Sequence, residues 1–299
     1  MGAFARWCKT SNAVVCAASA HLLLSCLFSA EDSGRYSYYS FPAYKRAQYA
    51  AFETLAGMAG KAYIGTSGWN YKSWRNGFYG DTPQKRWLRF CAERFSAIEV
   101  NGTFYRLQEK STFKKWRDET PKHFVFAIKG HRYVTHNKKL LDVGEAVIRC
   151  RESASPLGER LAAVVWQLPA FLKKNFGRLE QFLEDLQHWK STRHAIEFRH
   201  ESWFDDEIAE CLKRHAVAVC MSDAPDWPMW DRVTTDLVYV RLHGHTRKYA
   251  SSYSKTALRK WATRIRHWLG EDRAVHVYFD NDAEGAAPRN ALTLLETLG

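Results

Sequence analysis

The 299-residue sequence contains no apolar run of the about 20 residues that a membrane-spanning helix requires. Its seven cysteines form no Cys-x-x-Cys pair, which excludes the common zinc and redox motifs and disfavours a disulfide framework. It also lacks His-Glu-x-x-His and any dense series of histidines and carboxylates, so a site without metal or cofactor is the preferred interpretation. These absences favour a reduced, cytoplasmic protein that does not enter a membrane.

The residues that are present describe a folded, basic protein. Hydrophobic residues make up 46% of the chain and aromatic residues 14%, enough for a large core. Lys and Arg number 44 against 32 Asp and Glu, a formal charge of +12 with His neutral. A positive charge of this size suggests an anionic partner without identifying it.

Residues 1–57 differ from the rest of the chain. Two basic residues precede the apolar stretch Ala13–Ala30, which is the layout of a secretory signal. The alternative is a translation start at Met58, just before the first convincing strand. We favour the later start, because the downstream cysteines show no extracellular disulfide pattern. The predicted organisation is therefore an N-terminal extension outside the fold, residues 1–57, and one domain, residues 58–299.

Short apolar segments alternate with amphipathic segments from Lys61 onward. Alternating strands and helices imply an α/β fold with a parallel sheet. Eight such units in about 240 residues predict a single-domain (β/α)8 TIM barrel. An open doubly wound sheet is the alternative, but the loop after the first strand lacks the third glycine of a dinucleotide-binding turn. The predicted strands are Ala62–Thr66, Ala97–Asn101, Phe124–Lys129, Ala163–Gln167, Ala195–Arg199, Val217–Ser222, Leu237–His243 and Val275–Asn281.

Capping signals mark several of the intervening helices. Thr82, Asp205 and Ser254 are predicted N-caps, and Pro83 occupies the first turn after Thr82. Two prolines between the sixth and seventh strands leave little room for a regular helix there.

Polar side chains fall on one face of the predicted strands. Because alternate strand residues face opposite sides, Glu99 and Glu197 are expected to point into the barrel. Arg241 and His243 share the inner face of the seventh strand. The carboxyl ends of the strands carry the active sites of TIM-barrel enzymes. A structural ion pair is the simpler interpretation for any one residue, but burying the whole set is costly without a compensating role.

The chemistry of these side chains suggests their roles. Carboxylates and histidine can transfer protons, and Lys and Arg can hold phosphate or carboxylate oxygens. The candidate catalytic residues are Glu99, Glu197, Asp223 and His243. The candidate substrate-binding residues are Trp69, Asn101, Tyr105, Lys129, Gln167, Arg199, His200, Arg241 and Asn281.

Six segments, in order along the chain, also carry a family pattern. They are Ile64–Trp69, Ile98–Tyr105, Gln167–Pro169, Glu197–His200, Arg241–Gly244 and Tyr278–Asn281. Together they closely resemble the YecE-like family, also called domain of unknown function 72, from about Ala62 to Leu298. The resemblance implies a TIM barrel with a polar pocket at the strand ends, and a barrel similar to that of xylose-isomerase-like proteins, but no established activity. One departure is Asp280, which stands where the family commonly has Asn.

Three functions remain open at this point. The preferred one is an enzyme, whether hydrolase, lyase or isomerase, that acts on a small anionic or phosphorylated substrate by carboxylate acid/base chemistry. The second is a nucleic-acid-binding or nuclease-like protein, favoured by the basic charge and the 12 tryptophans. The third is a noncatalytic ligand sensor. The sequence does not determine the oligomeric state.

Overall fold

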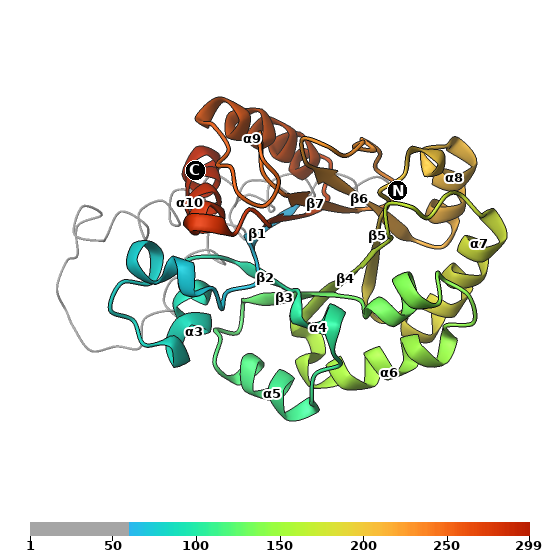
Figure 1. Cartoon of the computed structure of the whole chain (residues 1–299), viewed down its shortest axis with the longest axis horizontal. Coiled ribbons are helices and arrows are strands. Elements are labelled where there is room, and N and C mark those ends of the chain that lie inside the picture. Colours follow the sequence, from blue (N-terminus) through green and yellow to red (C-terminus); the bar gives the residue numbers. More distant parts are fainter. Residues whose placement is uncertain (1–59) are drawn as a thin grey trace, which may run out of the picture. The chain divides into compact units, whose positions relative to one another are not determined.

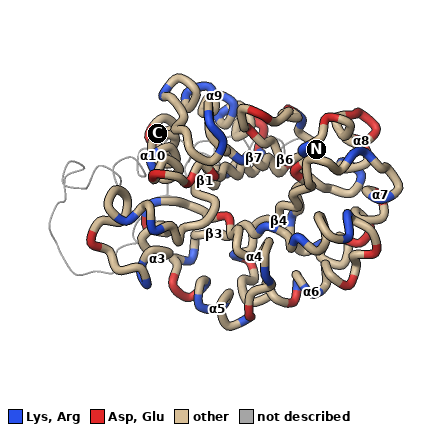
Figure 2. Tube along the Cα trace, in the orientation of Figure 1, with Lys and Arg blue, Asp and Glu red and all other residues tan. Residues whose placement is uncertain are grey.

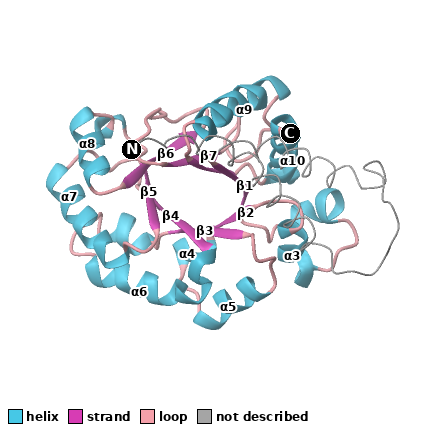
Figure 3. Cartoon of the chain, turned by 180° about the vertical axis from the view of Figure 1, so that it is seen from behind, coloured by secondary structure: helices cyan, strands magenta, loops and turns pink. Residues whose placement is uncertain are grey.

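The computed structural model describes residues 60–299, and the predicted extension, residues 1–57, lies outside them. Within the described residues, eight parallel strands pair in chain order and close into a barrel (Figure 1). The closure is the pairing of the first strand with the eighth. Helices surround the strands on the outside (Figure 3). The predicted (β/α)8 TIM barrel is therefore confirmed.

All eight predicted strands are present, with their ends within two residues of the predicted ones. The strands are β1 (Lys61–Ser67), β2 (Ala97–Val100), β3 (Val125–Lys129), β4 (Leu161–Gln167), β5 (Arg193–Glu197), β6 (Val217–Asp223), β7 (Leu237–Leu242) and β8 (Ala274–Phe279). The helices are α3 (Trp87–Ala92), α4 (Gly102–Tyr105), α5 (Lys110–Asp118), α6 (Gly144–Ala154), α7 (Phe176–Asp185), α8 (Asp206–Arg214), α9 (Lys255–Gly270) and α10 (Ala286–Leu298). Short 3-10 or π turns occupy Lys72–Trp74, Arg75–Tyr79, Gln84–Arg86, Tyr133–Asn137, Ser155–Arg160, Leu186–Trp189, Glu201–Trp203 and Ala283–Gly285. No helix among residues 60–299 is both long and apolar enough to cross a bilayer.

Two of the three predicted helix caps are confirmed. Asp205 accepts a hydrogen bond from the backbone N–H of Glu207 at 2.8 Å, and Ser254 caps α9 in the same way. The predicted cap at Thr82 is wrong, because the chain first makes the short turn Gln84–Arg86 and makes no side-chain cap there. The described segment between β6 and β7 has no helix, as its prolines predicted.

Alternate strand residues build two separate cores. The outer core packs the strands against the helices and contains the large residues Ile98, Trp166 and Phe198. The inner core fills the lumen mostly with small side chains and two tyrosines. Its buried members are Ala97, Ala127, Ala163, Val165, Ala195, Ala218, Cys220, Leu237, Tyr239 and Tyr278. Since the side-chain period of a strand is two, the residues that follow two positions later enter the lumen at the carboxyl end.

Candidate functional site

Arg241, on β7, lies at the centre of a buried group of charges at the carboxyl end of the barrel. Its Nη1 donates to Glu197 Oε2 at 2.7 Å, and its Nη2 donates to Glu99 Oε1 at 2.8 Å and to Asp280 Oδ2 at 2.9 Å. The Arg241 side chain is fully buried. Burial opposes its charge, but the three carboxylates together raise the pKa of Arg241 well above its ordinary value. We call Arg241, Glu99, Glu197 and Asp280 the arginine cluster.

Glu99 is held on all sides within this cluster. Arg241 Nε donates to both of its carboxylate oxygens at 3.1 Å. The Tyr239 hydroxyl donates to Oε2 at 2.6 Å, and the Ser67 hydroxyl donates to Oε1. Burial and the neighbouring Glu99 raise the pKa of Tyr239 well above its ordinary value, so the phenol stays a donor. Glu99 is therefore a satisfied buried carboxylate, locked by residues from β1 and β7.

Glu197 joins the cluster to the wall of the barrel mouth. Its Oε1 accepts from Arg199 Nε at 2.7 Å and from the Ser222 hydroxyl at 3.0 Å. Burial alone would raise the pKa of Glu197, but Arg199 and Arg241 hold it well below its ordinary value. The Arg199 guanidinium also lies over the Trp227 ring, 3.6 Å from the ring centroid. Glu197 is therefore ionised at neutral pH and fixed between two arginines.

His243 is fully buried between two carboxylates. Its Nε2 lies 3.6 Å from Glu197 Oε1 and its Nδ1 lies 3.1 Å from Asp280 Oδ2. The Trp227 ring packs edge-on against it at 4.8 Å between centroids. Burial opposes the charge of Asp280, but Arg241 and His243 lower its pKa to about 2. Both acidic neighbours of His243 are therefore negatively charged at neutral pH.

A second group of residues, from β3, the loop after it and α4, forms another wall of the mouth. Lys129 Nζ lies 4.3 Å from the centroid of the Phe104 ring, and the His136 ring packs edge-on against the same ring at 5.0 Å. His136 belongs to the π-helical turn Tyr133–Asn137, a kind of turn that recurs at functional sites. Burial and the Arg241 charge, which together outweigh the nearby carboxylates, lower the pKa of Lys129 to about 8.

The pKa of His136 reflects the positive charge around this wall. Burial, with the cations Lys129, Arg132 and Arg199, lowers its pKa to about 4, although Glu197 acts to raise it. Lys129 ends β3 and Arg199 lies in the loop after β5, so both walls of the mouth act on the same imidazole. The floor of the site carries the carboxylates and its walls carry cations and aromatic rings.

The structure brings seven of the predicted site residues together. Besides the members already described, Asn101 donates from Nδ2 to Asp280 Oδ1 at 3.3 Å. The seven are Glu99, Asn101, Lys129, Glu197, Arg199, Arg241 and His243. Gln167 also ends its strand on the lumen face, where it is buried and donates to the Leu168 carbonyl at 3.0 Å.

Three predicted residues lie at or beyond the edge of this arrangement. The Trp69 ring packs edge-on against Trp116 of α5 at 5.1 Å, in the outer layer. Tyr105 is 69% exposed on α4. His200 accepts from the backbone N–H of Ser202 at 3.1 Å and so caps the turn Glu201–Trp203. None of the contacts described for these three residues reaches the arginine cluster, so their role in substrate binding stays a prediction.

Asp223 and Asn281 require a correction, because both point away from the lumen. Asp223 Oδ2 accepts from the Trp261 indole N–H of α9 at 3.3 Å. Asn281 donates from Nδ2 to Asn290 Oδ1 of α10 at 2.9 Å. The neighbours Ser222 and Asp280 have the opposite strand parity, and they are the residues that enter the site.

Sequence reasoning missed residues of two kinds. Ser67, Ser222 and Asp280 could have been found, because each continues the lumen-facing alternation of its strand. Phe104 and His136 lie outside the strands, where no such period applies.

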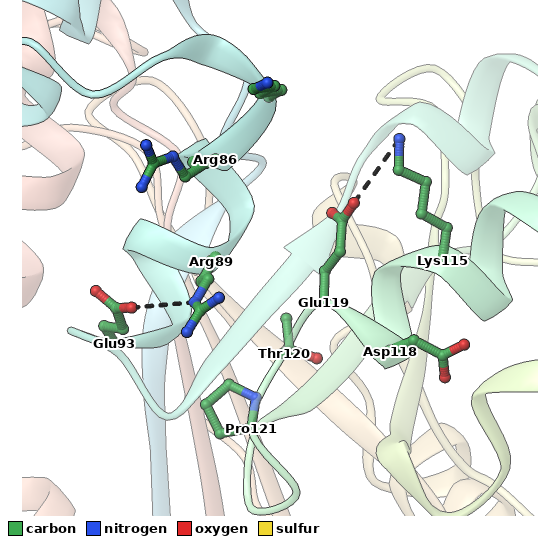
Figure 4. A pocket seen from close by; sticks show the side chains of 9 residues that line it. Arg86, Arg89, Glu93, Lys115, Asp118, Glu119, Thr120 and Pro121 are labelled. Atoms are coloured by element: carbon green, nitrogen blue, oxygen red, sulfur yellow. Dashed lines mark hydrogen bonds and ion pairs between the residues drawn. The ribbon is translucent and has the colours of Figure 1, made fainter.

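Two cavities of the described residues lie away from the arginine cluster. The larger, of about 790 Å³, opens between α3 and α5 and extends to Thr120 and Pro121, which precede β3 (Figure 4). Its charged residues pair locally and at the surface, as in the Arg89–Glu93 and Lys115–Glu119 ion pairs. The smaller, of about 320 Å³, lies between α8 and the segment before β7. We take the arginine cluster as the functional site, because buried perturbed charges mark such sites more strongly than exposed ion pairs do.

Metal binding has no ready-made ligand set in residues 60–299. No group of three or more His, Cys, Asp or Glu side chains in this range is arranged to hold an ion. The carboxylates of the arginine cluster are instead occupied by guanidinium and hydroxyl donors.

Comparisons with known proteins agree with the barrel. A family model described as "Protein of unknown function DUF72" matches residues 63–299. The chain is 24% identical over 274 residues to the UPF0759 protein YunF of Bacillus subtilis, covering 79% of this chain and 94% of that protein. A DUF72 family crystal structure from Thermotoga maritima is similar at 26% identity and a TM-score of 0.68, covering 78% of this chain and 97% of that one. One from Enterococcus faecalis has 20% identity and a TM-score of 0.70, covering 80% and 95%, and shows the shared fold.

Proposed function

The chain belongs to the DUF72 family of proteins of unknown function, and we propose that it is an enzyme whose small anionic substrate binds above the arginine cluster. The observation that carries this proposal is the complete burial of Arg241 with Glu99 and Glu197 at the carboxyl end of the barrel. A buried ion pair contributes little net stability compared with apolar residues of the same volume. The fold does not need these charges, and they lie where barrels of this type place their chemistry.

The distribution of charge favours an anion. Glu99, Glu197 and Asp280 all contact Arg241 directly, and Glu197 also contacts Arg199. Lys129 has no carboxylate oxygen within 4.0 Å among residues 60–299, so its positive charge faces the mouth unmatched. A phosphate or carboxylate group between Lys129 and the Arg199 wall would supply the missing counter-charge.

The carboxylates serve this site as fixed charges. A carboxylate whose pKa lies far below neutrality is a weak proton acceptor at neutral pH, which applies to Glu197 and Asp280. We therefore assign proton transfer to His243, which lies between them, and assign to the carboxylates the positioning of His243 and Arg241. This assignment narrows the acid/base role that the sequence suggested for Glu197.

Inorganic phosphate should raise the melting temperature of the protein. At 100 times the dissociation constant, a ligand that binds only the folded state stabilises it by about 2.7 kcal/mol. Lys129→Gln should weaken phosphate binding about tenfold or more, because a hydrogen bond to a charged group contributes about 1.5–3 kcal/mol. Thermal melts across a phosphate titration measure both effects.

The matched control is Lys85→Gln. Lys85 lines the distant cavity between α3 and α5, so this variant makes the same charge change away from the site. It should keep the phosphate-induced shift of the wild type. If both variants lose the same amount of phosphate affinity, phosphate binding depends only on the net charge of the protein, and the proposal fails.

His136 gives a second readout of anion binding. In the free protein its imidazole should titrate near pH 4, because burial and the nearby cations Lys129, Arg132 and Arg199 disfavour the charged form. A bound phosphate offsets those cations, so the pKa of His136 should rise. Histidine NMR titrations with and without phosphate, assigned with a His136→Gln variant, measure the change. A pKa of His136 that does not move in saturating phosphate would contradict a site at this wall.

A nucleic-acid ligand has weaker support. Along the outer helices, Lys and Arg alternate with Asp and Glu (Figure 2), and many of them form surface ion pairs. A duplex or single strand would instead require a continuous basic stripe. Strong, salt-dependent binding of an oligonucleotide would reverse this preference, and ligand binding without any turnover would favour a sensor.

A further inference from the structure

Lys129 differs from Arg199 and Arg241 in having no carboxylate partner within ion-pair distance among residues 60–299. It is the last residue of β3 and continues the lumen-facing alternation of Ala127. Arg199 and Arg241 are both within hydrogen-bond distance of carboxylates, at 2.7 to 2.9 Å. Lys129 Nζ instead lies over the Phe104 ring, and no carboxylate oxygen of residues 60–299 lies within 4.0 Å of it. A partly buried ammonium without an ion-pair partner is costly, so this position holds a larger fraction of neutral amine than an exposed lysine does.

Some groups around Lys129 lower its pKa and others raise it. Burial has the largest effect and lowers its pKa to about 8, with Arg241 next. The carboxylates raise it, but the arginines already bind them, and the Phe104 face favours the cation only modestly. The charged groups that act on Lys129 are Glu99 of β2, Glu197 of β5, Arg241 of β7 and Asp280 after β8. His136 of the following loop also faces Lys129, and Arg132 and Arg199 act on that imidazole in turn. Exposed lysines titrate near about 10.4, so Lys129 offers far more neutral amine at neutral pH.

We propose that Lys129 is a nucleophile that forms a Schiff base with the carbonyl group of an anionic aldehyde or ketone. This rests on the proposed function, which places an anion at the same mouth, and it adds the carbonyl group to the substrate class. A desolvated lysine beside another cation is the standard way in which a protein activates an amine. Arg199 and Arg132, which follow different strands, would hold the anionic end of the substrate.

The step balances without an oxidant or reductant. The lone pair of the neutral Lys129 amine attacks the carbonyl carbon, a carbon–nitrogen bond forms, and the carbonyl π electrons move to oxygen. The Lys129 ammonium gives up one proton before the attack and the attacking nitrogen gives up a second after it, and the oxygen takes both and leaves as water when the carbon–oxygen bond breaks. The net change converts one ammonium and one carbonyl into one iminium and one water. The iminium keeps the positive charge in the position that Lys129 Nζ occupied.

Borohydride trapping tests this proposal. The wild-type protein is incubated with limiting pyridoxal 5′-phosphate at pH 7.5, reduced with sodium borohydride, and digested for mass spectrometry. We expect the reduced adduct on Lys129 to form at least tenfold faster than on Lys85, an exposed lysine of the distant cavity. The labelling rate at Lys129 should rise through pH 8, and pyridoxal, which lacks the phosphate, should label it more slowly. Lys129→Arg should lose this adduct and keep those on other lysines.

The outcomes separate the two proposals. Labelling of Lys129 no faster than Lys85, or a labelling rate that rises only near pH 10, would overturn the Schiff-base proposal. If phosphate still binds in a Lys129-dependent way, the anionic site survives that result. Conversely, rapid labelling by pyridoxal and pyridoxal 5′-phosphate alike, with no phosphate binding, would support the nucleophile and remove the anionic substrate.

Discussion

Replacing Arg241 with methionine should lower the free energy of unfolding by about 3–5 kcal/mol at pH 7.5, because it leaves buried charges without a partner. Arg241 is the only residue in the described part of the chain that contacts Glu99, Glu197 and Asp280 together. Methionine keeps much of the volume, so the loss reflects charge more than a cavity. Urea unfolding of both proteins gives the difference.

The pH dependence identifies the cause of that loss. In the wild type, the folded-state pKa values of Glu197 and Asp280 are depressed, so their stabilisation is present above about pH 4 and is lost as the pH falls through the folded values. Without Arg241, burial meets less opposition and the pKa values of Glu197 and Asp280 rise, although Arg199 still holds Glu197, so the destabilisation is relieved as the pH falls. The difference between Arg241→Met and the wild type should therefore shrink from pH 7.5 to pH 4. A difference that stays constant would point to lost packing instead.

Phe198→Ala should cost about 3–5 kcal/mol of unfolding free energy, and this cost should not depend on pH. Phe198 is 3% exposed on the outer side of the barrel. Its ring packs against Trp203 at 5.2 Å and Trp230 at 5.6 Å between centroids. Truncation loses this burial and leaves a cavity among large side chains that cannot fill it. Urea unfolding at pH 7.5 and pH 4.5 measures the cost.

Glu197→Gln is the matched control, because residue 197 is adjacent to Phe198 in the chain and faces the opposite side. The amide keeps the volume, and Arg241 keeps Glu99 and Asp280, so the loss at pH 7.5 should be smaller than for Phe198→Ala. It should diminish toward low pH, where the wild-type carboxylate also loses its charge. Glu197→Gln should bind phosphate more tightly, because Arg199 loses its carboxylate partner and becomes available to the anion. Phe198→Ala should bind phosphate with the affinity of the wild type. The reverse pattern would contradict the placement of the site on the lumen face.

The strands and most of the inner face could be predicted from local sequence. Alternating apolar residues fixed the eight strands, and strict alternation placed Glu99, Lys129 and Arg241 in the lumen. The same alternation, applied to the ends of β6 and β8, selects Ser222 and Asp280 over the residues that follow them. The period of two is a property of the extended backbone itself, so it can be read without knowing any long-range contact.

The pairing of these groups was decided only by the tertiary structure. Arg241 reaches Glu99 across 142 positions of sequence, and whether it would bind one carboxylate or three depended on the closure of the barrel. Barrel closure also leaves Lys129 without an ion-pair partner, because Arg199 and Arg241 bind the carboxylates that could have paired with it. Phe104 and His136 were equally out of reach, because neither lies on a strand and the strand period does not extend to them. Which charges the sequence directs inward is thus a local property, but which of them stays unpaired is set by distances that exist only after the eight strands close.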